Sequence, residues 1–332
     1  MPGKLLITFG CSWTYGVGVS YHPGMSAADD SFWDLDLANS LSFRGIISKK
    51  LNYTNKNFSI GASSNQMQFR LAKEYFSSNE FDRDREYYSE IVVLWGITSI
   101  YRDELYSNLS NSFYNIMYSS SNVLHSSEIK IHNQYIKYFF DDNDEIRKIA
   151  LDILFWDKFF SKNDITNYWF DTFNHLDYTV PLISNHKKSY NKCAGSSWPQ
   201  WEDLITQNID HVDPEILNEI YDTKRFPWAR LLVDFPGFNN FIDFNNKNRD
   251  LASYLARHNG LDNLNKQIHT SNWEADTDCI KFLAKVGIVN PYSFHPTQRG
   301  HQQLADYFIA KIKDCRSAKV LAKTGGKKKK KQ

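Results

Sequence analysis

Three short strand-like runs, each followed at once by a glycine, constrain the fold of this chain more than any other feature of its sequence. The runs are residues 4–9, 57–60 and 91–95, and the glycines are Gly10, Gly61 and Gly96. The first and third are apolar runs typical of strands buried on both faces, as in parallel sheets, and residues 57–60 (NFSI) are a candidate second short strand. The order strand, helix, strand, helix, strand then predicts right-handed crossovers between parallel neighbours.

Helix signals fill the two gaps between these runs. In the first gap, four apolar residues share one helical face, with Ser42 as the expected N-cap. These residues are Phe43, Ile46, Ile47 and Leu51. In the second gap, Met67, Leu71 and Tyr75 recur at every fourth position. We therefore expect an α/β fold with a parallel sheet between layers of helices.

The rest of the chain is expected to complete a single domain that spans residues 1–316. Residues 145–160 have an amphipathic helical period, and residues 179–184 are a candidate strand weakened by a proline. Insertions that form a lid or side lobe are expected at about 105–175 and 185–230, where the pattern of strands and helices is interrupted.

A helix is expected directly after His295, because four apolar residues beyond it fall on one face. They are Leu304, Phe308, Ile309 and Ile312. Residues 317–332 then form a basic C-terminal tail that we predict to be disordered. Its lysines can make weak contact with nucleic acid or another polyanion, although a solubilising end is the simpler interpretation. They are Lys327, Lys328, Lys329, Lys330 and Lys331.

Charge, cysteine usage and missing motifs exclude several classes of protein. A net charge of +1 gives the chain no electrostatic bias toward nucleic acid or a membrane. Four scattered cysteines argue against a structural zinc site and a disulfide-stapled secreted module. They are Cys11, Cys193, Cys279 and Cys315. No HExxH, GxGxxG or GxxxxGK[ST] motif occurs, so we expect neither a metal nor an organic cofactor. Without a signal-peptide pattern or a long apolar run, a cytoplasmic protein is expected.

Polar residues that can carry chemistry lie next to the predicted strands. Ser12 follows the first strand within residues 10–16 (GCSWTYG), where its hydroxyl would stand above the sheet edge. A serine hydroxyl is not nucleophilic at neutral pH and needs a neighbouring base. Among ten histidines, His295 has the context of such a base, since it lies in a loop just before a helix. The simpler interpretations are a helix N-cap for Ser12 and a turn glycine for Gly61.

Together these segments resemble the blocks of the SGNH (GDSL-type) hydrolase family. The first block of the family reads Gly-Asp-Ser-x-Thr-x-Gly, and residues 10–16 match it except that Cys11 replaces the Asp. The glycine of the second block corresponds to Gly61. The third block, Gly-x-Asn-Asp, corresponds to residues 96–99 (GITS), and the last, Asp-x-x-His, corresponds to residues 292–295 (YSFH).

The resemblance implies a flavodoxin-like, three-layer α/β/α sandwich and a serine esterase. The enzyme would act on a small acyl ester, with O-acetyl groups of a carbohydrate as one candidate. Ser12 would attack the carbonyl with His295 as base. Backbone N–H groups of Ser12 and Gly61 would hold the oxyanion, helped by Thr98. Tyr292 stands where the family has the Asp that orients the histidine.

Two departures from the family blocks keep a second hypothesis open. Thr98 replaces a side-chain amide, and loss of one oxyanion donor typically costs ~10²–10³ in rate. Tyr292 cannot stabilise an imidazolium as a carboxylate does, so a backbone carbonyl, Asp103 or Glu104 would have to take over. The alternative is a catalytically idle SGNH-like module that is structural, virion-associated or carbohydrate-binding. Tryptophans of the expected insertion favour sugar binding: Trp198, Trp201 and Trp228. The Gly-Cys-Ser form and Arg102-x-Glu104 also look like versions found in tailed-phage genomes.

Overall fold

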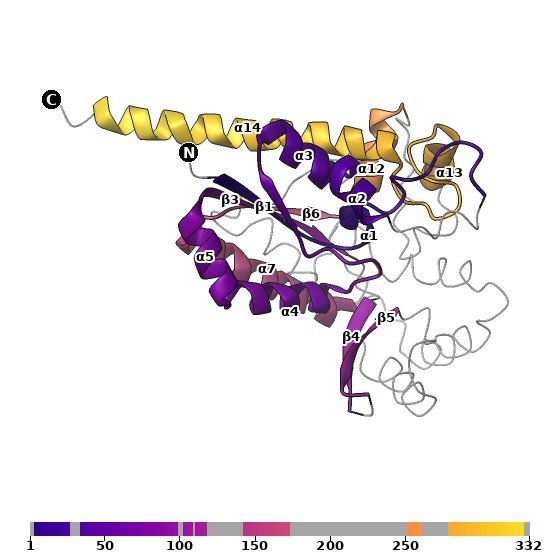
Figure 1. Ribbon diagram of the computed structural model, residues 1–332, viewed down its shortest axis with the longest axis horizontal. Helices are drawn as coiled ribbons and strands as arrows, with labels where there is room; N and C mark the ends of the chain where they lie inside the picture. Colours follow the sequence, from indigo (N-terminus) through magenta and orange to yellow (C-terminus); the bar gives the residue numbers. More distant parts are fainter. Residues whose placement is uncertain are drawn as a thin grey trace, which may run out of the picture.

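A four-stranded parallel sheet lies at the centre of the computed structural model (Figure 1). The structure describes residues 3–26, 34–98, 102–108, 110–117, 142–172, 251–260 and 278–328. The sheet order is β2-β1-β3-β6, with β1 (Gly3–Phe9), β2 (Thr54–Asn57), β3 (Tyr88–Ile97) and β6 (Thr166–Asp171). An antiparallel hairpin consists of β4 (Arg102–Ser107) and β5 (Ser112–Met117). The predicted mixed α/β fold with a parallel sheet is therefore confirmed.

The central strands are buried on both faces, as their continuous apolar sequences predicted. Because successive side chains of a strand point to opposite faces, β1 and β3 each contribute to two hydrophobic cores. Leu5, Ile7 and Val93 enter one core, whereas Leu6 and Val92 enter the other. All five side chains are fully buried, so both layers of helices are fixed to the sheet by apolar contacts.

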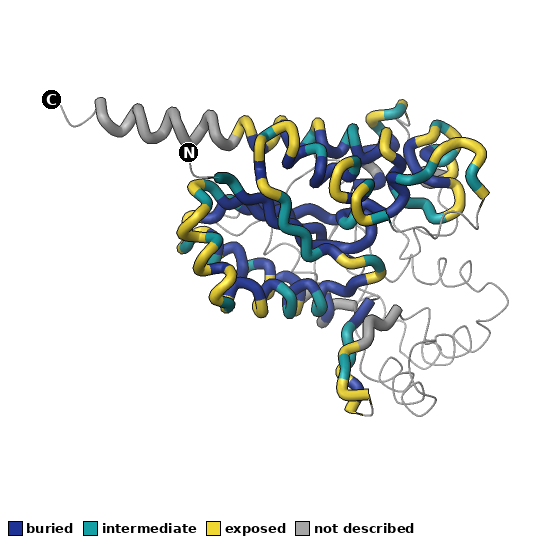
Figure 2. Tube along the Cα trace, in the orientation of Figure 1, coloured by how far each residue is buried: buried dark blue, intermediate teal, exposed yellow. Residues whose placement is uncertain are grey.

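Helices cover both faces of this sheet (Figure 1). One face carries α4 (Asn65–Phe76), α5 (Asn79–Tyr87) and α7 (Asp142–Lys162). The other carries α1 (Ser12–Tyr15), α3 (Phe43–Leu51), α12 (Leu251–His258), α13 (Asp278–Lys285) and α14 (Gln298–Lys328). The short helix α2 (Leu35–Leu41) packs against α3. In Figure 2 most of β1 and β3 is dark blue, and many of the exposed positions, in yellow, lie on the outer turns of the helices.

The first two predicted helices are confirmed, with one change of face. The helix α3 begins at Phe43, and the Ser42 side chain caps it by accepting a hydrogen bond from the Gly45 N–H (3.3 Å). The helix α4 covers the expected segment, but its fully packed face is built around Phe69 and Ala72. Of the positions expected in the core, Tyr75 is buried, while Met67 and Leu71 are only partly buried.

Two strand boundaries differ from the prediction. The second strand, β2, spans Thr54–Asn57, whereas residues 57–60 were expected to form it. Its sequence TNKN is polar and partly exposed, so it lacks the apolar signal of a buried strand. Gly96 does not end the third strand, because it pairs with Phe170 of β6 and β3 continues to Ile97.

The range 105–175 supplies two elements of the central unit where an insertion was predicted. The helix α7 contains the expected segment 145–160, and five of its side chains are buried in the core against the sheet. The strand β6 pairs in parallel with β3 and places Trp169 in the same core. The candidate strand at 179–184 and the insertion at 185–230 lie outside the described residues.

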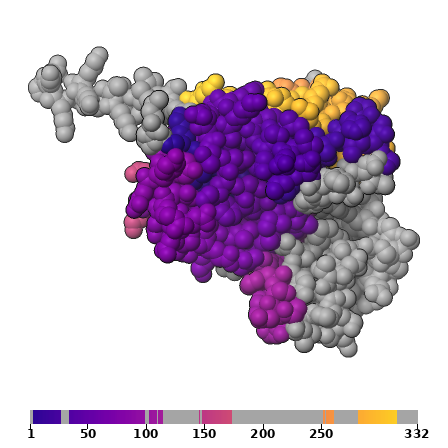
Figure 3. Space-filling model, in the orientation of Figure 1, coloured from indigo at the N-terminus to yellow at the C-terminus, as the bar shows by residue number. Residues whose placement is uncertain are grey.

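The final helix, α14, begins three residues after His295 and buries the predicted face. Its backbone stays helical to Lys328, where a disordered tail was predicted from residue 317. Residues 317–323 (SAKVLAK) are rich in good helix formers, which accounts for the difference. In Figure 3 this helix runs along one edge of the face formed mainly by the N-terminal part of the chain. Within the described ranges, no helix is long and apolar enough to cross a membrane.

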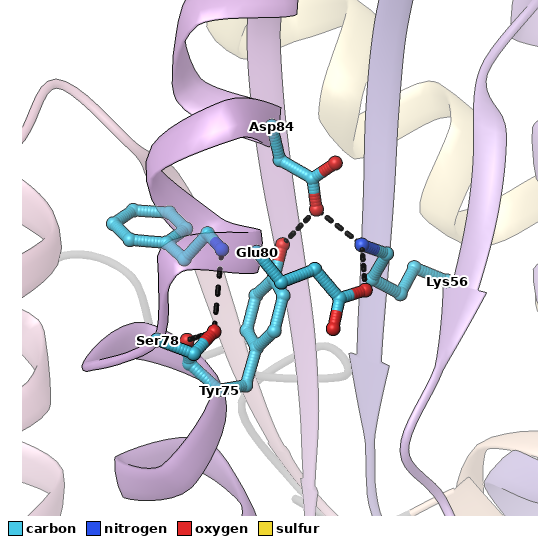
Figure 4. Close-up of polar contacts among 6 residues, drawn as sticks. Lys56, Tyr75, Ser78, Glu80 and Asp84 are labelled. Carbon is cyan, nitrogen blue, oxygen red and sulfur yellow. Dashed lines mark hydrogen bonds and ion pairs between the residues drawn. The ribbon is translucent and has the colours of Figure 1, made fainter.

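A charged cluster fastens β2 to α4 and α5 (Figure 4). The Lys56 ammonium donates to the Glu80 carboxylate (2.8 Å) and to Asp84, and the Tyr75 hydroxyl donates to the same Asp84 oxygen (2.6 Å). Burial lowers the pKa of Lys56, but the hydrogen bonds to Asp84 and Glu80 outweigh it and raise this pKa above its usual value. This Lys56 cluster therefore pairs its charged groups with one another.

Candidate active site

The first polar side chain beyond β1 is lifted above the sheet by a very short helix. The chain leaves Phe9, passes Gly10 and enters α1, of which Ser12 is the first residue. The N-cap of this helix is Cys11, whose side chain makes no capping hydrogen bond and is buried in the apolar core. Ser12 is therefore not the helix cap of the simpler interpretation, and its hydroxyl is available for another partner.

That partner is His295. The Oγ atom of Ser12 lies 2.7 Å from Nε2 of His295, across 283 positions of the sequence. Ser12 is only 4% exposed, so this contact is largely sheltered from water. Residues from the two ends of the domain thus meet at the carboxyl edge of the sheet, where sites form in parallel α/β folds.

A tightly bonded loop holds His295 in place. The Asn290 N–H donates to the His295 carbonyl (2.8 Å), and the Phe294 N–H donates to the Asn290 carbonyl (2.8 Å). Phe294 has a positive φ of 56°, an uncommon conformation for a bulky residue. Directly after the loop, the Thr297 hydroxyl donates to the Gly287 carbonyl (2.8 Å). The local backbone thus fixes the position from which the imidazole reaches Ser12.

The loop after α1 comes so close to His295 that only glycine fits there. Gly18 has a φ of 92°, which favours glycine, and a Cβ added to it would lie 2.7 Å from the Pro296 carbonyl oxygen. The same Cβ would lie 2.9 Å from the Cβ of His295. A side chain at this position would therefore push the imidazole loop away from Ser12.

The environment of His295 favours its neutral form. Although the residue keeps partial exposure, desolvation of its ring lowers the pKa, and the positive charge of Arg102 lowers it further, to about 4. The Ser293 backbone acts in the opposite direction as a hydrogen-bond partner of the ring. Since the ordinary histidine pKa is about 6.5, His295 is an unprotonated base at neutral pH.

The residues considered as orienters of His295 make other contacts. Tyr292 is 48% exposed, and its ring packs edge-on against that of Tyr21, with centroids 6.4 Å apart. Glu104 is held by Arg70 through two hydrogen bonds of 2.7 and 2.6 Å. Asp103 accepts a hydrogen bond from the backbone N–H that follows it (2.7 Å). The contact to the ring that favours an imidazolium comes instead from the Ser293 backbone.

The loop that contains Gly61 is bonded to the start of the Ser12 segment. The Ile60 N–H (3.1 Å) and the Ser63 hydroxyl (3.0 Å) both donate to the Gly10 carbonyl, two residues before Ser12. Gly61 lies between these two donors. In the part of the chain that the structure describes, neither the Ser12 nor the Gly61 N–H donates to another group. Two backbone donors thus remain available in two segments that are bonded to each other beside Ser12.

Thr98 lies at the same edge of the sheet and is completely buried. Its backbone N–H donates to Asn65 Oδ1 (2.9 Å), and its carbonyl accepts from Asn65 Nδ2 (2.9 Å). Its hydroxyl accepts from Arg102 Nη1 (3.2 Å). The predicted residues Ser12, His295, Gly61 and Thr98 therefore all belong to segments that meet at this edge.

Three contributors were missed as parts of the site in the sequence analysis. Asn65 and Arg102 are both buried and bonded to Thr98, and Ser293 acts through its backbone. Arg102 was noticed only for its spacing from Glu104, and that acid pairs elsewhere. No local sequence signal marks these roles, because the burial of Arg102, which calls for a partner, becomes visible only in the structure.

A second histidine, His301, lies next to the site and connects the elements that surround it. His301, the fourth residue of α14, is completely buried, and its Nδ1 accepts a hydrogen bond from the Phe43 N–H (3.3 Å). Burial lowers the pKa of His301 to about 3, while a hydrogen bond with the Val17 backbone acts to raise it. The neutral ring links α14 to α3 and to the loop that follows α1.

Comparisons of the whole chain add no relative to this geometry: no protein-family model matches it, and no curated protein is significantly similar. The tryptophans on which the sugar-binding alternative rests lie outside the described residues. Among the residues that are described, no three His, Cys, Asp or Glu side chains gather as metal ligands would.

Proposed function

We propose that this protein is a serine ester hydrolase of the SGNH type. The observation that carries the proposal is the 2.7 Å contact between Ser12 Oγ and His295 Nε2 at the carboxyl edge of a parallel sheet. A neutral imidazole at this distance accepts the serine proton as the hydroxyl attacks an ester carbonyl. The imidazolium then returns this proton to the alcohol that leaves as the tetrahedral intermediate collapses to the acyl-serine. Water hydrolyses the acyl-serine with the same imidazole as base, which releases the acid and restores the Ser12 hydroxyl.

The oxyanion of this reaction would be held by backbone donors. The N–H groups of Ser12 and Gly61 are the two best candidates, because the loop that contains Gly61 is bonded to the Gly10 carbonyl just before Ser12, and neither N–H has another acceptor among the described residues. Thr98 would add a hydroxyl. Donors that are fixed before the reaction stabilise the developing charge without reorganisation, and this stabilisation is usually the greatest single contribution to the rate of such reactions.

The proposed enzyme works as a Ser–His dyad rather than a triad. The Ser293 carbonyl would take the orienting role that a carboxylate has in a triad, since its backbone already favours the protonated ring. A carbonyl dipole stabilises the imidazolium less than a full negative charge does. We therefore expect a modest rate on unactivated esters. The substrate that we propose is an ester of a small acyl group, such as O-acetyl on a carbohydrate.

The test is hydrolysis of p-nitrophenyl acetate by the wild-type protein, Ser12→Ala and His295→Ala. We expect kcat/KM to fall by about 10⁴-fold or more in each variant, because the nucleophile and its base act as a unit. Ser40→Ala is the matched control, since the Ser40 hydroxyl is exposed and bonded to the Asp36 carbonyl (2.9 Å). An equal rate in Ser12→Ala and wild type would contradict the proposal.

A second readout does not depend on the choice of ester. A fluorophosphonate that reacts with activated serines should add its mass to the wild-type protein and not to Ser12→Ala. If the folded protein neither reacts with this probe nor turns over acetylated glycans, the idle SGNH-like module becomes the better interpretation. Binding of those glycans without turnover would then identify its role.

A further inference from the structure

Both backbone polar groups of Thr98 are bonded to a single side chain. The Asn65 side chain occupies both its backbone N–H and its carbonyl, each at 2.9 Å. Asn65 is itself the first residue of α4 and is 1% exposed, so its amide has little freedom to move. The main chain of Thr98 is thereby fixed, and the hydroxyl is the one donor that this residue has left.

A hydrogen bond from Arg102 restricts the directions in which the Thr98 hydroxyl can donate. Its Nη1 donates to Thr98 Oγ1 at 3.2 Å, and the arginine is 6% exposed. A hydroxyl that accepts from a cation must direct its own proton elsewhere. Among the described residues nothing accepts that proton. The hydroxyl is therefore an oriented donor whose acceptor is absent from the described part of the protein.

The strand register brings this donor to the serine. Phe9 of β1 pairs with Trp95 of β3, so Gly10 and Gly96 follow side by side on neighbouring strands. Ser12 follows the first glycine by two residues, and Thr98 follows the second by two. Arg102 is also close enough to His295 to act on its charge. The hydroxyl, the guanidinium, the imidazole and the serine thus share one site.

We propose that Arg102 is a positioning residue which, together with Asn65, orients the Thr98 hydroxyl to donate to the oxyanion. This inference rests on the proposed function, because it explains how one of the proposed oxyanion donors is oriented. It explains how the site manages without the side-chain amide found in the SGNH family at the position of Thr98. The amide is replaced by a hydroxyl, a guanidinium that occupies its lone pair, and an asparagine that fixes its backbone.

The experiment compares kcat and KM for p-nitrophenyl acetate in Thr98→Val, Thr98→Ser, Arg102→Met and the double variant Thr98→Val with Arg102→Met. Removal of the hydroxyl should lower kcat by about 10²-fold with little change in KM, because the donor acts in the transition state. Thr98→Ser should recover most of this loss. Arg102→Met should lower kcat in the wild-type background but cost nothing further when Thr98 is already valine. Independent, multiplied losses would overturn the inference.

A pH profile separates positioning from mere structural support. His295 is faced by the charge of Arg102, and it is also close enough to His301 to act on the pKa of that second, neutral ring. Loss of the arginine charge should move the acid limb of kcat/KM to higher pH, whereas Thr98→Val should leave it in place. Unchanged limbs in Arg102→Met would count against the inference. If Arg102→Met does not unfold cooperatively on heating, Thr98→Val carries the test, and an unchanged kcat there would overturn it.

Fluorophosphonate labelling distinguishes failure of the proposed function from failure of the inference on Arg102. Wild-type protein that is not labelled at Ser12 removes the proposed function and this inference with it. Normal labelling together with multiplied losses removes the inference alone, and normal labelling with non-additive losses supports both.

Discussion

Two polar clusters of this protein contain similar groups and have opposite character. In the Lys56 cluster a cation, a phenol and two carboxylates hydrogen-bond to one another (Figure 4). At the Ser12 edge a cation, two hydroxyls and an imidazole are brought together, and the pKa of His295 is lowered rather than raised. A cluster that satisfies itself fastens helices to a sheet, whereas one that leaves donors without acceptors is suited to bind a reacting group.

The largest expected effect is a loss of stability in acid, which arises from the histidine of the Ser12 edge and from His301 next to it. Both His295 and His301 have lowered pKa values in the folded state, about 4 and about 3, against about 6.5 when unfolded. Between these values the unfolded chain binds more protons, so stability falls as pH drops below about 6.5. Each histidine contributes up to about 1.4 kcal/mol per pH unit.

Urea unfolding from pH 7.5 to 4.5 checks this expectation. His301→Asn isolates the contribution of this histidine, since an asparagine oxygen can accept from the Phe43 N–H as Nδ1 does. We expect its free energy of unfolding to change less steeply with pH than that of the wild type. Parallel slopes for the two proteins would show that His301 is not a source of acid sensitivity.

The next largest effect concerns the glycine that faces His295. Gly18→Ala should lower kcat/KM by at least about 10²-fold, because a displacement of about 1 Å at a catalytic group can cost that much. Gly24→Ala is the matched control: its φ of 100° is strained in the same way, but a Cβ there meets nothing within 4 Å. Gly18→Ala should lose more stability than Gly24→Ala, because only its Cβ meets neighbouring atoms, and only Gly18→Ala should lose activity. Equal activities would mean that the loop yields without moving the imidazole.

A smaller effect is expected at the Lys56 cluster, and on stability alone. Asp84→Ala removes the shared acceptor of Lys56 and Tyr75 and should cost about 1–3 kcal/mol, the usual penalty for polar groups left without partners. Lys50→Met breaks an exposed ion pair with Asp306 (2.8 Å) and should cost less than about 1 kcal/mol. Chemical denaturation measures both, and kcat should stay unchanged in each. A fall in kcat for Asp84→Ala would show that the two clusters are coupled.

The last expectation concerns the position of the acid limb of the wild-type reaction. Because the base must be unprotonated, kcat/KM should rise with pH through the lowered pKa of His295 and be level by about pH 6. The midpoint is expected at the pKa of about 4 rather than at the ordinary value of about 6.5. A stopped-flow assay limits exposure to acid, so that the limb is measured before unfolding. A midpoint at the ordinary value would mean that the ring is solvated in the working enzyme.

The parts of the fold that were predictable are those with a local signal. The strands β1 and β3 are continuous apolar runs, and α3 and α14 have a clear helical period. The strand β6 was missed because polar Thr166, Asn167 and Asp171 break its apolar character, although Trp169 and Phe170 are fully buried. Such a strand is defined by its pairing with β3, and pairing has no mark in the sequence.

The residues of the candidate site that were predictable are likewise those with a local sequence signal. Ser12 and His295 were found because a serine after a strand and a histidine before a helix have recognisable local contexts. Asn65 and Arg102 were missed because their roles consist of contacts with Thr98 that arise only in three dimensions. Ser293 acts through its backbone, which its side-chain identity does not indicate.

If Ser12 and His295 act as proposed, the span between them also sets a time at which the protein can begin to act. The two residues are 283 positions apart, so the hydroxyl is synthesised long before the base that would activate it. At roughly 5–20 residues per second, about 15–60 s of translation separate them. During that interval the nascent chain carries an unactivated serine, and competence arrives only with the loop that precedes α14. A product truncated before residue 295 would thus be chemically silent, however well its first strands had assembled.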